Sequence, residues 1–372
     1  MGKKQLTIDE IARLSDVSVA TVSRVLNGNP QVGAELVERV KKVIESTGYS
    51  PSKVAAGLSR GRQESIALIS GVPDFQGIPD ASGLSSREAT SGTQAVNSFV
   101  LSLSFGIYDV LEPGGFRLRL VNIPREINTL SPPEVKRWIQ MTIDSREIAG
   151  AIFMNPADHE PVLEALLATE HPCVVLGDST SGKDAPRVDV DNVDGMRAVT
   201  GHLLELGHRR IGFLCPKGDR TVIRDRSEGF VEAHEYLGIP LQKGWWLESP
   251  VAEPPIFSYR NARRAVEQAL ESDFPYTAIV AYNDEMAFGA IQAFSARGWN
   301  VPQRVSVVGF DDLPAAPMFA PPLTTVRQDI VKIGQHAARN LLRTLKGREV
   351  PHATIIPTQL VVRESSAPPR AS

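Results

Sequence analysis

The chain has 372 residues, 42% of them apolar and 22% charged, which is the composition of a globular protein with two or three domains. No stretch approaches the roughly 20 apolar residues that cross a bilayer, and the start MGKKQLTIDE lacks the apolar centre of a secretory signal. The two cysteines, Cys173 and Cys215, do not make a disulfide framework. We therefore expect a cytoplasmic protein with no membrane partner.

The net charge of −3 conceals a basic N-terminal segment. Residues 1–62 contain ten Lys and Arg against six Asp and Glu, a net charge of +4, which leaves −7 for the rest of the chain. A basic segment on an acidic body indicates that a polyanion binds the first segment alone.

Two short helices separated by a break are predicted near the start. Thr7 and Glu10 form a T-x-x-E capping box that begins the first helix. Beyond the break, the hydroxyl of Ser18 can accept a hydrogen bond from the backbone N–H of Ala20 or Thr21 and so cap the second helix. The apolar side of the first helix consists of Ile8, Ile11, Ala12 and Leu14.

The second helix is predicted to expose a face that suits DNA. Burial of Val22, with Val25 or Leu26, turns another set of side chains toward solvent: Val19, Ala20, Ser23 and Arg24. A third helix, from about Ala34 to Thr47 with Gly48 as its stop, closes a small core. This helix-turn-helix arrangement fits a major groove, where arginine reads guanine and small apolar groups touch thymine methyls. The alternative is that Arg24 is an ordinary surface residue of a three-helix bundle.

A short fourth helix is predicted within YSPSKVAAGLSRG, residues 49–61. Ser50 and Pro51 suit its cap and first turn, and Ala55 and Leu58 share one face. A helix of about eight residues that contains Gly57 is marginal by itself in water, so it needs a partner to form. Its leucine can act as an apolar wedge in a minor groove.

After residue 63, apolar segments short enough for parallel strands alternate with helical patterns such as the one across 261–270. The strand segments are SIALIS, FRLRLV, AGAIFM and PCVVLGD, followed by RRIGFLC, YTAIVAYND and VSVVGFDD. We predict an α/β core of two doubly wound parallel-sheet subdomains behind an all-α head. A small ligand is expected at the carboxyl ends of the strands, between the subdomains.

The runs TIDEIARLSDVSVATVSRVLN (7–27) and GYSPSKVAAGL (48–58) resemble the DNA-binding head and hinge of LacI/GalR-type regulators. The resemblance continues through GHRRI, RSEGF, YNDEMAFG, VSVVGFDD and PLTTV, and covers nearly the whole chain. It implies a core like that of type I periplasmic sugar-binding proteins, with crossings between subdomains near 190, 326 and 357. The implied divisions are a head at 1–48, a hinge at 49–63, one subdomain at 64–190 with 327–357, another at 191–326 with 358–364, and a disordered Pro/Ser-rich tail at 365–372.

The same resemblance implies residues that contact DNA. Val19, Ala20 and Arg24 match positions that contact bases, and Leu58 matches a leucine that enters the minor groove at the centre of a palindromic operator. Ala55 matches a position that lies against that groove. Phosphate contacts are implied for Thr7, Ser18, Thr21 and Asn27. The implied partner is double-stranded operator DNA, bound by a homodimer that usually represses transcription.

The resemblance also implies a sugar-like effector. A carboxylate accepts from vicinal hydroxyls, arginine and asparagine donate to sugar oxygens, and an aromatic ring covers the apolar face. The matching positions are Arg226, Phe257, Asn283, Asp311 and Gln328, to which Asp74 and Phe75 are added because they end the first strand. Each has a structural alternative: Asp284 or Asp311 could cap a helix, Arg226 could be a surface ion-pair partner, and Phe257 could be plain core.

Two departures from the family pattern affect this interpretation. Residues 76–96 are a Gly/Ser-rich insertion after the first strand, either a lid over the cleft or a tolerated surface loop. Asp178 and Ser179 stand where the family often has an arginine that contacts effectors. A phosphate-bearing effector therefore loses one expected partner.

Neither of two enzyme-like motifs has the required context. GLSRG at 57–61 precedes a strand instead of following one, as a hydrolase elbow must. GDSTSGK at 177–183 lacks the Ser or Thr and the helix of a phosphate-binding loop. We expect no catalytic residues, no cofactor and no metal site. The alternatives to a ligand-controlled regulator are a cytoplasmic solute-binding protein and an α/β enzyme of sugar metabolism, but only the regulator uses residues 1–60.

Overall fold

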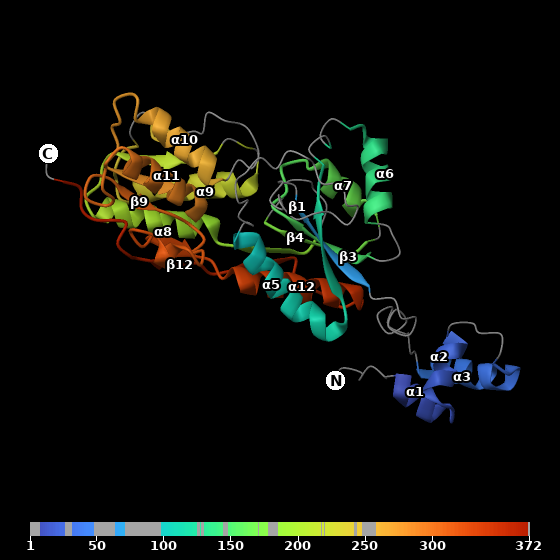
Figure 1. Ribbon diagram of the computed structural model, residues 1–372. Coiled ribbons are helices and arrows are strands. Elements are labelled where there is room, and N and C mark those ends of the chain that lie inside the picture. The colour runs from blue at the N-terminus through green and yellow to red at the C-terminus, as the bar shows by residue number, and fades with distance from the viewer. Residues whose placement is uncertain are drawn as a thin grey trace.

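The computed structural model shows a group of three short helices, two parallel sheets covered by helices, and a pair of antiparallel strands (Figure 1). It describes residues 8–26, 32–47, 64–70, 98–124, 127, 130–143, 148–169, 171–177, 185–216, 218, 220–241, 244–247 and 258–370. Several expectations fall outside the described residues, namely those for Thr7, Asn27, the helix within 49–61 with Ala55 and Leu58, Asp74, Phe75, the 76–96 insertion, and Phe257.

The three short helices pack around a small apolar core. They are α1 (Ile8–Leu14), α2 (Val19–Leu26) and α3 (Ala34–Thr47). The buried side chains at their centre are Ile11, Ala12, Val22 and Val40. The hydroxyl of Ser18 accepts a hydrogen bond from the N–H of Thr21 at 3.1 Å, which confirms the predicted cap of α2.

The placement of Leu14 on the apolar side of the first helix is wrong, because 51% of its side chain is exposed. The chain leaves α1 at this point. Asp16 adopts a left-handed conformation, with φ of 51°, and the turn that follows brings Val17 against the core.

The first sheet has six parallel strands in the order β11-β5-β4-β3-β1-β2. Its strands are β1 (Ser65–Ser70), β2 (Arg117–Asn122), β3 (Ile148–Met154), β4 (Cys173–Leu176), β5 (Arg187–Val190) and β11 (Ala353–Ile356). Side chains of a strand alternate between two faces. Along β1, Ile66 and Leu68 therefore join one apolar cluster, with α5 (Ser98–Leu111) and α12 (Ile330–Leu345), and Ala67 and Ile69 join another, with α6 (Pro132–Thr142) and α7 (Pro161–Leu167).

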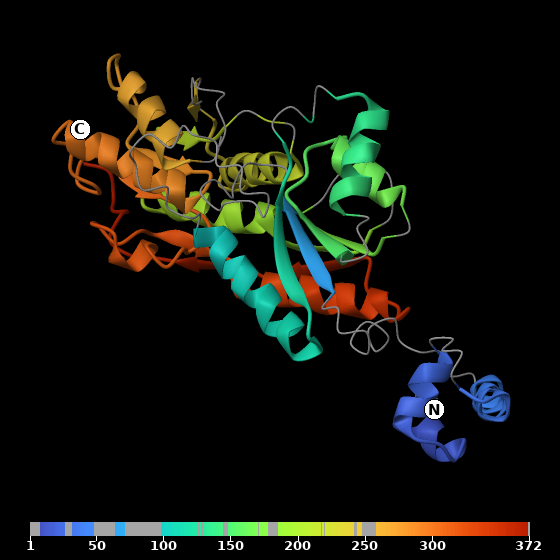
Figure 2. The same cartoon turned by 45° about the vertical axis from the view of Figure 1, so that its right-hand side comes forward.

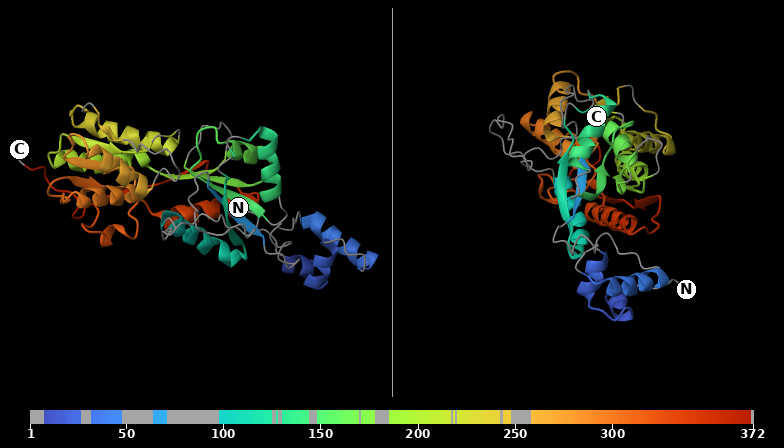
Figure 3. Two further views of the ribbon diagram at one scale, coloured as in Figure 1. Left: turned by 45° about the horizontal axis from the view of Figure 1, so that its top comes forward. Right: turned by 90° about the vertical axis from the view of Figure 1, so that its right-hand side faces the viewer.

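The second sheet has four parallel strands in the order β7-β6-β8-β9. They are β6 (Ile211–Leu214), β7 (Trp246–Leu247), β8 (Ala278–Ala281) and β9 (Ser306–Val308). The helices α8 (Asn192–Glu205) and α9 (Thr221–Tyr236) pack together, as do α10 (Tyr259–Ala269) and α11 (Asp284–Ala296). Figure 3 shows the two sheets with their helices at opposite ends of the core.

The chain passes between the two parallel sheets three times. After β5 it enters α8, whose partner helix belongs to the second sheet. It returns through β10 (Thr325–Arg327) to α12, and after β11 it crosses again as β12 (Gln359–Val361). β10 and β12 pair antiparallel, so backbone hydrogen bonds connect two of the three crossing segments.

Two glycines bring α5 and α12 into close contact, as the adjacent helices in Figure 2 show. A Cβ atom at Gly106 would lie 2.1 Å from the carbonyl oxygen of Val331, and one at Gly334 would lie 2.5 Å from that of Leu103. No real Cβ atom approaches a backbone atom so closely. Each helix therefore depends on a glycine in the other to reach this spacing.

The predicted disorder of the tail at 365–372 is wrong as far as residue 370, because this segment continues alongside β9. Ser365 is fully buried, and its hydroxyl donates to the carbonyl oxygen of Val307 at 2.5 Å. The N–H of Thr324 donates to the same hydroxyl at 2.8 Å. Serine in this tail satisfies backbone groups at the sheet edge, a use that composition alone does not reveal.

Candidate functional site

The carboxyl ends of both parallel sheets face one cleft, as expected for sheets of this kind. The cleft holds about 770 Å³ of space, part of it open solvent. Polar side chains from both sheets line it. They include Asn155, Asp189, Arg226, Asn283, Asp311 and Gln328.

Arg226, on α9, connects the polar groups at the centre of the cleft. Its Nε donates to Oδ1 of Asn192 at 3.0 Å, and its Nη1 donates to the carbonyl oxygen of Tyr282 at 2.7 Å. Its Nη2 lies 3.6 Å from Oδ1 of Asp311, and its guanidinium carbon lies 3.8 Å from the ring centroid of Phe310. Only 4% of Arg226 is exposed, so it is not the surface ion-pair partner of the structural alternative.

Asp311 follows β9 and is held in the wall of the cleft. The side-chain amide of Gln328 donates to its Oδ1 at 2.5 Å, on the oxygen that Arg226 approaches. The φ of Asp311 is 126°, a strained backbone conformation that concentrates at functional sites. Burial raises the pKa of its carboxyl to about 6, against the opposing effects of the Arg226 charge and the Gln328 hydrogen bond.

Asn283 and Asp284 have different structural roles at the start of α11. Oδ1 of Asn283 accepts from the N–H of Met286 at 2.9 Å, so this residue caps the helix while it lines the cleft. Asp284 is wholly buried and connects α11 to the segments after β9: its carboxylate accepts from the Thr325 hydroxyl at 2.5 Å and from the Leu313 N–H at 2.8 Å. Burial and the nearby Asp311 charge raise the pKa of Asp284.

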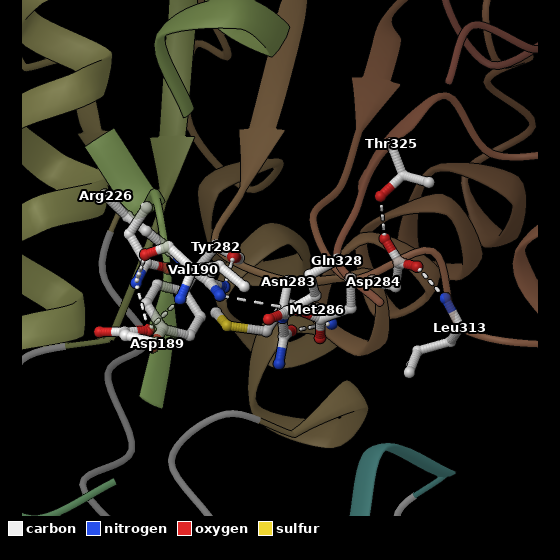
Figure 4. A network of polar contacts seen from close by, with 12 residues as sticks. Asp189, Val190, Arg226, Tyr282, Asn283, Asp284, Met286, Leu313, Thr325 and Gln328 are labelled. Atoms are coloured by element: carbon white, nitrogen blue, oxygen red, sulfur yellow. Dashed lines mark hydrogen bonds and ion pairs between the residues drawn. The ribbon is translucent and has the colours of Figure 1, made fainter. Parts of the chain in front are cut away.

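Asp189 and Asn192 also line the cleft and were not predicted from the sequence. Figure 4 shows Asp189 in the polar network of the cleft. Oδ1 of Asp189 accepts from the N–H of Val190 at 2.7 Å and from the side-chain amide of Asn192 at 3.1 Å. Burial raises the pKa of Asp189 to about 6. A signal was present, because this aspartate stands at the end of the RVDV strand, where ligand groups converge.

Contacts across the cleft join the start of α9 to the segment that follows β3. Nη1 of Arg220 donates to the carbonyl oxygen of Asn155. Arg224 pairs with both carboxylate oxygens of Asp158, with Nη2 lying 3.3 Å from Oδ1. These contacts connect elements of the two sheets, so they respond to any change in the angle between them.

The exposed side of α2 carries the side chains that are predicted to contact DNA. Val19 is 39% exposed, and Ala20 and Arg24 are also exposed, whereas Val22 is buried on the side away from Ala20 and Arg24. Ser18 is exposed at the cap, and Thr21 is half-buried beside it. The helix therefore exposes two small side chains and one guanidinium.

Two absences apply to the described residues. Among them, no group of three or more His, Cys, Asp or Glu side chains is arranged to hold a metal ion. In the same part of the chain, no helix combines the length and the apolar character that a membrane crossing requires.

Known families match both parts of this architecture. The model of bacterial regulatory proteins of the lacI family matches residues 7–52, over the three short helices. The model of the periplasmic binding protein-like domain matches residues 200–366. The chain belongs to the LacI family of bacterial regulatory proteins. The predicted family and fold class are therefore confirmed.

Relatives of this regulator match along nearly its whole length. The HTH-type transcriptional regulator DegA of Bacillus subtilis (strain 168) is 29% identical over 366 residues, which cover 97% of this chain and 98% of DegA. The HTH-type transcriptional repressor PurR of Haemophilus influenzae (strain PittEE) is 29% identical over 363 residues, covering 96% and 98%. The solved complex of the transcriptional regulator CelR with cellobiose has a TM-score of 0.67 at 26% identity, covering 97% of this chain and all of CelR. The protein is a LacI-family transcriptional regulator with a DNA-binding head and an effector-binding core.

Proposed function

We propose that this regulator is a repressor that binds a palindromic operator as a homodimer. A sugar-like effector bound in the cleft changes its affinity for the operator. One observation carries the proposal. Arg226 pairs with Asp311 within the part of the chain that builds the second sheet, and it also donates to Asn192, which follows β5 at the first crossing between the sheets. A ligand bound there contacts the point at which the two sheets are connected. It can therefore change the angle between them.

The proposed divisions of the chain make this coupling mechanical. The head (1–48) is followed by the hinge (49–63), which leads directly into β1 of the first subdomain (64–190 with 327–357). The second subdomain (191–326 with 358–364) forms the other wall of the cleft. Effector binding and operator binding then share one conformational equilibrium, and each changes the affinity of the other.

The exposed face of α2 is proposed to read the operator. Val19, Ala20 and Arg24 contact base edges in the major groove, with the guanidinium donating to guanine and the small groups touching thymine methyls. Ser18 and Thr21 lie at the N-terminal end of the same helix, where hydroxyls and backbone N–H groups suit phosphates. The remaining proposed DNA contacts are Thr7, Asn27, Ala55 and Leu58.

The cleft residues are proposed to bind a polyhydroxylated ligand. Asp311 accepts from hydroxyls, and Asn283 and Gln328 present amides beside it. The solved complex of CelR with cellobiose, a regulator of the same fold, supports this chemistry. The further proposed effector contacts are Arg226, Asp74, Phe75 and Phe257.

Helix α5 offers a surface for the second copy in the homodimer. Leu101, Phe105 and Tyr108 are 61%, 64% and 51% exposed, and their spacing places them on one face of the helix. The opposite face, with Val100 and Leu103, is buried against the sheet. A row of large apolar side chains in solvent is a typical protein–protein contact surface.

Binding alone accounts for this function. We infer that the protein acts in the cytoplasm without catalysing a reaction or requiring a cofactor. The support is the regulatory role of DegA and PurR, which match the chain from end to end.

The experiment that tests the proposal is operator selection from a random palindromic library, followed by binding measurements with Arg24→Ala. We expect this variant to lose base preference at one position of each half-site, at a cost of about 1–3 kcal/mol. The matched control is Lys41→Ala, which removes an equal charge from the exposed side of α3 and should weaken all sequences alike. If Arg24→Ala discriminates operator sequences as well as the parent does, the assignment of α2 is refuted.

A further inference from the structure

The cleft is rich in carboxylates. Among the described residues that line it, Asp189, Glu285 and Asp311 are acidic, and Arg226 supplies the single cation. Among these lining residues, acidic side chains therefore outnumber basic ones. The net charge of the lining side chains affects which class of effector can bind.

The positive charge of Arg226 is already committed to protein groups. It faces Asp311 at 3.6 Å, and two of its nitrogens donate to Asn192 and to the Tyr282 carbonyl oxygen. Its position over the Phe310 ring fixes the plane of the guanidinium further. A ligand phosphate could recruit this charge only by leaving Asp311 buried without its counter-ion, which is costly.

Asp189 is in the opposite situation. Both hydrogen bonds that it accepts, from Val190 and Asn192, go to Oδ1. No donor among the described residues contacts Oδ2, although the side chain lines the cleft. Asp189 accepts no hydrogen bond from Arg226, whose charge acts on it through space. Asn192 connects the two side chains, because it donates to the carboxylate and accepts from the guanidinium. One carboxylate oxygen is thus left for a ligand donor.

We propose that the effector carries a protonated amine, held by Oδ2 of Asp189, so that the cleft selects an amine-bearing polyol such as an amino sugar over sugar phosphates and sugar acids. The inference rests on the proposed effector role of the cleft. An ammonium group donates strong charge-assisted hydrogen bonds to a carboxylate. It also offsets the excess of acidic over basic side chains among the described residues that line the cleft.

The electrostatics of the cleft agree with this geometry. Burial raises the pKa of Asp189 to about 6, which means that its ionised form is poorly solvated in the fold. A cation placed beside it removes that penalty. A neutral hydroxyl removes less of it, and a phosphate adds to it.

The test is calorimetric titration of the full chain with three sets of hexoses: glucosamine, galactosamine and mannosamine; their parent hexoses; and the 6-phosphates of those parents. The pH is kept below the pKa of the amines. We expect at least one amino sugar to bind about tenfold or more tightly than its parent hexose, with the phosphate weakest. The proposal is overturned if no amino sugar binds, or if a parent hexose or phosphate binds as tightly as the matching amine.

Two variants identify the carboxylate responsible. Asp189→Asn keeps an oxygen for Val190 and Asn192 but removes the charge, so affinity for the amine should fall about tenfold more than affinity for the parent hexose. Asp225→Asn is the control, because this carboxylate acts on Asp189 through space but does not line the cleft. Unchanged amine preference in Asp189→Asn, or an equal loss in the control, refutes the assignment.

Operator binding separates this inference from the function on which it rests. A protein that binds its selected operator specifically and responds to a neutral sugar keeps the proposed function and refutes the amine. A protein that binds all DNA alike, with or without these compounds, refutes the proposed function itself.

Discussion

Replacement of Arg226 by methionine tests the network at the centre of the cleft. The change removes the ion pair with Asp311, whose partners are 5% and 6% exposed, and the hydrogen bonds to Asn192 and to the Tyr282 carbonyl oxygen. Loss of one partner from a buried pair typically costs about 3–5 kcal/mol, because the other charge is left in a poorly solvating site. Methionine keeps much of the volume, so cavity formation adds little.

The cost should depend on pH in a defined direction. The pKa of Asp311 is about 6 with Arg226 beside it, and removal of that cation raises the pKa further. Below this value the carboxyl is protonated, and the loss of the cation matters less. Above it, folding must either bury an unpaired charge or take up a proton, at about 1.4 kcal/mol per pH unit. Arg226→Met should therefore be more destabilising at pH 8 than at pH 5.5.

The assay is thermal unfolding of the ligand-free protein at both pH values. For domains of this size, about 2–4 °C of melting temperature corresponds to 1 kcal/mol, so the expected decrease at pH 8 is on the order of 10 °C. Adding Asp311→Asn should restore much of that loss, because the unpaired charge is then absent. Equal decreases in melting temperature at the two pH values would show that the Arg226–Asp311 ion pair does not account for the loss of stability. A double variant as unstable as Arg226→Met alone would show the same.

Three further predictions concern other parts of the molecule. Gly106→Ala should lower the free energy of unfolding by about 3 kcal/mol in denaturant titration, because its Cβ would lie 2.1 Å from the Val331 carbonyl oxygen. Gly201→Ala is the control: its Cβ would meet no atom within 4 Å, so this variant should stabilise α8 by up to about 1 kcal/mol. Asp189 binds its proton more tightly in the fold, with a pKa of about 6, than in the unfolded chain, so its contribution to stability decreases as the pH rises from about 4 to 6. Asp189→Asn should accordingly raise the melting temperature at pH 8 and leave it unchanged near pH 4. Phe105→Glu should shift the protein from dimer to monomer in sedimentation equilibrium while its circular dichroism is retained, and a persisting dimer would exclude α5 as the contact.

The regular elements were largely predictable, because their apolar patterns are local. SIALIS is β1 from Ser65 to Ser70, and the third helix of the head runs from Ala34 to Thr47, both as expected. The pairing of β11 with β5 was not predictable, because it joins segments more than 150 residues apart through backbone groups that carry no sequence signature. The ordered tail was missed because its serine side chains bond to backbone atoms that sequence does not place.

The cleft was predictable in part. Arg226, Asn283, Asp311 and Gln328 all line one cavity, as the resemblance to the family implied. The sequence could not show that Asn283 would also cap α11. Nor could it show that both hydrogen bonds to Asp189 would go to Oδ1 and leave Oδ2 for a ligand. Those properties depend on side-chain directions across two sheets, and only the three-dimensional arrangement fixes them.

The threefold passage of the backbone between the sheets restricts how this protein can be recombined. Its DNA-reading helices form one uninterrupted stretch, from Ile8 to Thr47, and a single junction could transplant them between relatives. Neither sheet can be exchanged so simply, because β11 is separated from β5 by the whole of the second sheet. A chimera that inherits ligand recognition must carry the entire region after the hinge as one genetic block.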